Sequence, residues 1–146
     1  MTKRLRYLWV LLLLSSLPGL TPSAFAHHSF AMYANEKQIK FTGKVSRFDW
    51  TNPHVYIEMD GKDAKDAKGV SKHWTVECAN ISILGRLGWT FNMIKVGDEI
   101  TVIVAPLHSG QPGALLKQVT LPDGRKMGNG NPAGPPDPAL AGGNQP

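Results

Sequence analysis

The chain has 146 residues, a formal charge of +5 and one cysteine, Cys78. Its length allows one small domain, and a single cysteine excludes an intramolecular disulfide framework. Three of the sixteen Lys and Arg residues precede position 27, whereas all eleven acidic residues follow it. The remainder therefore carries only about +2 and lacks the basic footprint of a nucleic-acid-binding protein, so we expect no nucleic-acid partner.

Residues 1–26 have the pattern of a secretory signal peptide. Basic residues at positions 3, 4 and 6 precede an apolar run, and Ala24-Phe25-Ala26 forms an A-x-A cleavage site. The apolar run is too short for a stable membrane span. We therefore expect a periplasmic protein that is cleaved after Ala26 and has no stable membrane anchor afterwards; the alternative is a retained amphipathic anchor.

A short arm, residues 27–35, is expected to lead into a domain over residues 36–127. The domain begins with a hairpin whose strands are Phe41 to Trp50 and Val55 to Asp60. Gly43 marks a bulge or a close approach in the first strand. In the second strand apolar and polar residues alternate, which predicts one buried and one solvent-facing side. The polar side carries His54, Tyr56 and Glu58.

The rest of the domain is predicted to contain three more strands and one helix. A third strand, Lys72 to Cys78, places Trp74, Val76 and Cys78 on one face, so we expect a buried, inert thiol. Asn80 is a good N-cap for a helix from Ile81 to Leu87, which Gly88 ends. Two further strands run from Glu99 to Ala105 and from Ala114 to Leu121.

This order of elements predicts the fold. Three strands, one short helix and two strands are typical of an OB-fold. We therefore expect an all-β domain with one short helix, folded as a small five-stranded OB-fold-like barrel; a β-sandwich is the alternative and needs more strands. Residues 128–146 are rich in Gly, Pro and Asn and are expected to form a disordered tail, because they offer little apolar surface to bury.

A set of short motifs suggests a relationship to other proteins. The motifs are His27-His28-Ser29-Phe30, Thr42-Gly43-Lys44-Val45, Trp50-Thr51-Asn52-Pro53-His54, Glu77, Leu87-Gly88-Trp89 and Val96-Gly97-Asp98. This combination resembles an uncharacterised family of small exported proteins from Gram-negative bacteria with a His-His-Ser-Phe mature start. The resemblance implies a periplasmic protein of unknown function and assigns no catalytic residue.

The expected mature N-terminus is a candidate metal site. If cleavage follows Ala26, the α-amino group and Nδ1 of His27 can chelate Cu(II). His28 and a barrel histidine, His54, are candidates to complete the site. The alternative is that the two histidines only follow a signal peptide on a frayed arm.

A second candidate patch lies on the polar side of the second and third strands. One register that matches like faces puts Glu58 opposite His73 and His54 opposite Glu77. Two imidazoles and two carboxylates on one patch can bind Zn(II) or Cu(II). The alternative is a pair of weak cross-strand contacts on the surface.

These observations favour a periplasmic binding or accessory module that takes copper or zinc. No nucleophile elbow, zinc-protease helix or phosphate loop occurs in the chain, which argues against an enzyme of those classes. A metal-dependent enzyme with a dispersed site is one alternative. A structural envelope protein that binds a partner without metal is the other, and ligand and partner stay open.

Processing gives the first testable prediction. The cleavage pattern places the mature start at His27, because small residues occupy the positions that signal peptidase reads. N-terminal sequencing or the intact mass of protein recovered from the periplasm checks this. A start at any other residue would remove the amino-terminal chelate of His27.

Overall fold

A computed structural model describes residues 30–63, 69–130 and 134–141. The expected signal peptide and the candidate ligands His27 and His28 lie outside these residues. The elements, in chain order, are η1 (Phe30–Met32), β1 (Ile39–Asp49), β2 (Tyr56–Asp63), β3 (Lys72–Glu77), α2 (Ile81–Arg86), β4 (Glu99–Pro106), β5 (Gly113–Thr120), β6 (Lys126–Gly128) and α3 (Pro138–Ala141).

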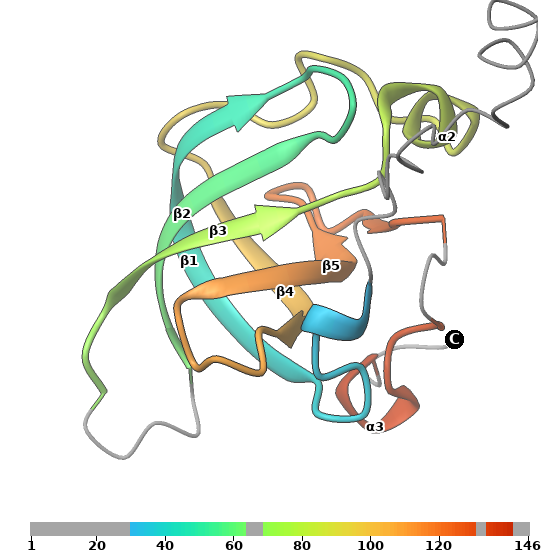
Figure 1. Cartoon of the computed structure of the whole chain (residues 1–146). Coiled ribbons are helices and arrows are strands. Elements are labelled where there is room, and N and C mark those ends of the chain that lie inside the picture. Colours follow the sequence, from blue (N-terminus) through green and yellow to red (C-terminus); the bar gives the residue numbers. More distant parts are fainter. Residues whose placement is uncertain (1–29, 64–68, 131–133, 142–146) are drawn as a thin grey trace, which may run out of the picture.

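The strands form a closed barrel with the predicted topology (Figure 1). Their order is β3-β2-β1-β4-β5-β6, and an additional parallel pairing joins β3 to β5. All other neighbouring strands are antiparallel. The structure thus confirms an all-β, five-stranded OB-fold-like barrel, to which β6 adds one short strand.

The long strand β1 serves both halves of the barrel, because it pairs with β2 and with β4. Its register against β2 shifts between Val45 and Arg47, so the bulge lies there and not at Gly43. Gly43 is instead a close-approach site. A Cβ on Gly43 would come within 2.9 Å of the Gly61 Cα and would overlap the Asp60 carbonyl, which explains why a glycine occupies the crossing of the two strands.

The core fills the barrel with the apolar faces of all five strands. Trp74 is 6% exposed and its ring lies 4.7 Å from that of Phe41, measured between centroids. Cys78 is fully buried and is a free thiol, as expected. Burial raises the pKa of this thiol well above its usual range, so it remains protonated and unreactive.

Helix α2 connects β3 to β4 and has the predicted caps. The Asn80 side chain accepts a hydrogen bond from the Ile83 amide at 2.9 Å, and Gly88 follows the helix with a φ of +85°. Leu84 projects from this helix into the core and is fully buried. Within the described ranges, no helix is long and apolar enough to cross a membrane.

The segment before β1 is packed against the barrel, which the sequence did not predict. Tyr33 and Ala34 are 6% and 4% exposed, although the domain was expected to begin at residue 36. Tyr33 forms a β-bridge with Leu107 and packs with Ala105 and Leu115 in a second small apolar cluster. The Ala34 amide donates to the Pro106 carbonyl at 2.8 Å. The ordered domain therefore begins upstream of β1.

The domain also extends past its expected end at residue 127. Gly128 belongs to β6, and Asn129 is 2% exposed, so the disordered tail expected from residue 128 is not observed at these positions. The Asn129 side chain accepts from the Ala79 amide at 2.7 Å and donates to the Leu116 carbonyl at 2.9 Å. One polar side chain thus satisfies two buried backbone groups, which composition alone does not reveal.

This arrangement predicts that Asn129 is important for stability. Asn129→Ala should lower the free energy of unfolding by about 1–3 kcal/mol, because two buried backbone groups lose their partner. Urea unfolding measures the change. Asn92→Ala is the control, since Asn92 is exposed and its side chain accepts only from the Thr90 hydroxyl; a loss as large in Asn92→Ala would contradict the assignment.

Candidate functional site

The register of β2 and β3 differs from the predicted one by two residues. Tyr56, not His54, is opposite Glu77, and Asp60, not Glu58, is opposite His73. A slip of two residues leaves every side chain on its original face, so alternation alone cannot distinguish these registers. The predicted side-chain pairs nevertheless form as diagonal contacts.

Glu77 lies at the centre of a buried polar cluster. Its Oε1 is 2.9 Å from His54 Nδ1, and its Oε2 accepts a hydrogen bond from the Tyr33 hydroxyl at 2.8 Å. His54 Nδ1 is also 3.2 Å from the Cys78 carbonyl oxygen. Tyr56 lies directly opposite Glu77 on β2. Burial raises the pKa of Tyr56 most, and the nearby Glu77 carboxylate raises it further. We call these four residues, Tyr33, His54, Tyr56 and Glu77, the Glu77 cluster.

Burial explains why the cluster is so fully bonded. The Glu77 side chain is only 11% exposed and that of His54 is 20% exposed. Burying a carboxylate without partners costs roughly several kcal/mol of folding free energy. Buried carboxylates are therefore found with hydrogen bonds or ion pairs. Burial, then the hydrogen bond to Glu77, raises the pKa of Tyr33 far above its usual range. Tyr33 therefore acts as a permanent donor to the carboxylate.

The segment around Tyr33 is held against the barrel by further contacts. Buried Lys117 donates from Nζ to Asn35 Oδ1 at 2.8 Å, and the His108 amide donates to the Met32 carbonyl at 3.0 Å. Burial lowers the pKa of Lys117. Sequence reasoning missed Tyr33, Asn35 and Lys117, because none of them is part of a periodic pattern or a ligand motif.

His73 belongs to a separate and exposed group. Its Nδ1 is 2.9 Å from Asp60 Oδ1 and its Nε2 is 3.5 Å from Glu58 Oε2, and its side chain is 52% exposed. The hydrogen bond to Asp60 is the largest of the effects that raise the pKa of His73. The four residues of the second candidate patch are thus divided into two pairs, His54 with Glu77 and His73 with Glu58.

Within the part of the chain that the structure describes, no three or more His, Cys, Asp or Glu side chains are arranged to hold a metal ion. A site that uses the barrel histidines would need ligands from elsewhere. The other ligands predicted from the sequence, His27 and His28, lie outside the described residues.

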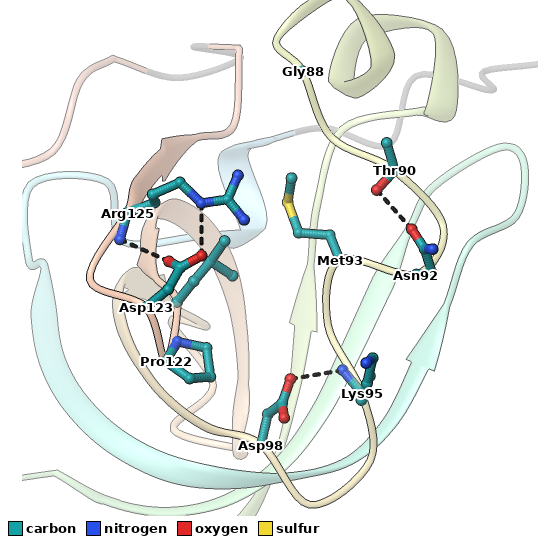
Figure 2. A pocket seen from close by; sticks show the side chains of 10 residues that line it. Gly88, Thr90, Asn92, Met93, Lys95, Asp98, Pro122, Asp123 and Arg125 are labelled. Atoms are coloured by element: carbon teal, nitrogen blue, oxygen red, sulfur yellow. Dashed lines mark hydrogen bonds and ion pairs between the residues drawn. The ribbon is translucent and has the colours of Figure 1, made fainter.

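A polar cavity of about 490 Å³ lies between the loop after α2 and the turn after β5, but it contains none of the predicted ligands (Figure 2). Both of its carboxylates are engaged locally. Arg125 Nε donates to Asp123 Oδ2 at 2.7 Å, and Asp98 Oδ2 accepts from the Lys95 amide at 2.9 Å. Neither His54 nor Glu77 lines this cavity. The Glu77 cluster is the candidate functional site, because it joins a histidine predicted as a ligand to a buried carboxylate.

Comparison with known proteins gives one match. Residues 16–117 match a family of unknown function (DUF6152), and this range covers more than half of the chain and includes His27, His28, His54 and Glu77. Searches of the curated proteins and of the solved structures found no match. The chain therefore belongs to the family of unknown function DUF6152.

Proposed function

We propose that this protein is an exported periplasmic binding module for Cu(II) or Zn(II), whose ligands are His27, His28 and His54. The observation that carries the proposal is the contact of 2.9 Å between His54 Nδ1 and the buried carboxylate of Glu77. Histidines that bind metals usually donate one ring N–H to a carboxylate or a carbonyl, and the other ring nitrogen binds the metal. Glu77 orients His54 in this way.

The tautomer follows from the partners of His54. Both the Glu77 Oε1 and the Cys78 carbonyl oxygen lie near Nδ1, and both are acceptors. Nδ1 therefore carries the proton in the neutral ring, which leaves the lone pair on Nε2. The Tyr33 hydroxyl, which donates to the other oxygen of Glu77, holds the carboxylate in place. A ring fixed in one tautomer and one orientation loses little entropy when it binds a metal.

Chain length supports the participation of His27 and His28. His28 is five residues before Tyr33, whose hydroxyl contacts the carboxylate that orients His54. Five residues span at most about 18 Å when fully extended. Because Tyr33 and Asn35 are anchored on the barrel, His28 is tethered within this distance of Tyr33, and the proposal requires the chelate predicted for His27 to meet His54 within a similar reach.

His73 is the weaker candidate for the barrel ligand. Asp60 raises the pKa of His73, and a ring that keeps its proton to higher pH competes less well for a metal ion. His73 is also half exposed and contacts two carboxylates through both ring nitrogens. The His54 side chain, by contrast, is only 20% exposed, and Nδ1 is the nitrogen that contacts Glu77.

The terminal chelate is tested by adding one alanine before His27. This extension blocks the geometry of amine and imidazole and leaves the barrel unchanged. Cu(II) affinity, measured by calorimetric titration of the mature protein, should fall at least tenfold, which corresponds to about 1.4 kcal/mol. His54→Ala should also weaken binding, whereas His108→Ala, a histidine on the exposed β4–β5 loop, should not. Equal affinity of the extended and native proteins would refute the terminal site.

Two glutamates offer a matched test of the orienting carboxylate. Glu77→Gln retains the size of the side chain and removes the charge that faces His54, so metal affinity should fall by about 10-fold to 100-fold. Glu58→Gln changes a partner of His73 and should alter metal affinity less than about twofold. Tyr33→Phe is a milder variant for the case that Glu77→Gln does not fold. The reverse order of effects would assign the metal to His73 and Glu58.

A further inference from the structure

A second cavity, of about 540 Å³, lies between the chain before β1, the start of β3 and the β4–β5 loop. Ligand pockets in proteins have volumes of about 300–1,000 Å³, so this cavity is large enough for a small organic molecule. Ile39, Trp74 and Leu107 supply apolar wall, and none of the residues of the Glu77 cluster lines the cavity.

Trp74, one of the residues that line this cavity, carries an unsatisfied hydrogen-bond donor. In the described ranges its Nε1 is the one buried side-chain nitrogen or oxygen that has no hydrogen-bond partner. By contrast, the indole of Trp89, also buried, donates to the Gly128 carbonyl at 3.0 Å. Buried donors nearly always have a partner, and one without a partner calls for a water or a ligand atom that accepts. The cavity beside Trp74 is where such an acceptor can enter.

The charges around the cavity indicate what kind of acceptor fits. Lys37, Lys72 and His108 line it, together with one acidic residue, Glu36. Two ammonium groups against one carboxylate leave a net positive charge, which favours an anion. Lys37 and Lys72 are exposed residues at the rim of the cavity, where an anion can approach them from solvent.

We propose that this cavity binds a carboxylate that carries a short unbranched apolar chain. The carboxylate accepts a hydrogen bond from Trp74 Nε1 and is attracted by Lys37 and Lys72, and the apolar chain lies along Ile39 and Leu107. The lining therefore matches the two halves of such a molecule. The proposal is independent of metal binding, because this cavity is lined by none of the residues proposed to bind or orient the metal.

Octanoate is the probe that tests this site. In mature protein with ¹⁵N-labelled tryptophan, the indole resonance of Trp74 is identified by its disappearance in Trp74→Phe. This resonance should shift saturably when octanoate is added. Trp74→Phe retains an aromatic ring but removes the donor, and it should weaken octanoate binding at least about tenfold, which corresponds to about 1.4 kcal/mol.

Two controls separate this site from non-specific binding of an apolar chain. 1-Octanol has the same chain without the charge and should bind at least about tenfold more weakly. Lys37→Gln should weaken octanoate binding severalfold, whereas Lys95→Gln, which changes an exposed lysine at the other cavity, should leave it unchanged; this pair also decides the matter if Trp74→Phe does not fold. An unmoved Trp74 resonance, equal binding of octanol, or equal effects of the two lysine variants would overturn the proposal.

Discussion

β3 and β5 run parallel over three residue pairs, from Thr75 with Gly113 to Glu77 with Leu115, and this short contact turns a twisted sheet into a closed barrel. Without it β3 would be an edge strand with unpaired backbone groups. The amide of Thr75 extends the contact by donating to the Pro112 carbonyl at 3.0 Å. Closure also fixes where β3 ends, and therefore where Glu77 lies.

The position of Glu77 links the stability of the barrel to its candidate function. The segment of residues 30–35 lies over the outer surface of β4 and β5 and contributes Tyr33 to the Glu77 cluster. Alternation assigns Glu77 to the solvent-facing side of β3, but this segment covers that side, and Glu77 is therefore buried. A buried carboxylate needs partners, and the partners here are a phenol and an imidazole. The same contacts that remove this burial cost orient His54.

The chain before β1 contributes to both proposed sites. Tyr33 reaches the Glu77 cluster, while Ala34, Glu36 and Lys37 line the cavity beside Trp74. Asn35 between them is fixed by the buried Lys117. Five consecutive residues thus contribute to both the proposed metal site and the proposed carboxylate site.

The local pattern of the sequence was sufficient to predict the barrel. Alternation in β2 and β3, the Asn80 cap and Gly88 each depend on neighbours along the chain, so they specify element type and order before any tertiary contact exists. The burial of Trp74 and Cys78 follows from the same alternation. The histidines His54 and His73 and their glutamates were also recognisable, because residues on one face of adjacent strands must meet.

Only the tertiary structure decided which of these residues form one site. A slip of β2 against β3 by two residues keeps every side chain on its face, so only the structure shows which register forms. Tyr33 is 44 residues from Glu77 and Asn129 is 50 residues from Ala79, and neither contact leaves a local signal. Burial of the Glu77 carboxylate and of the Asn129 amide could therefore not be predicted from the alternation of apolar and polar residues, because it depends on which distant segment covers a strand.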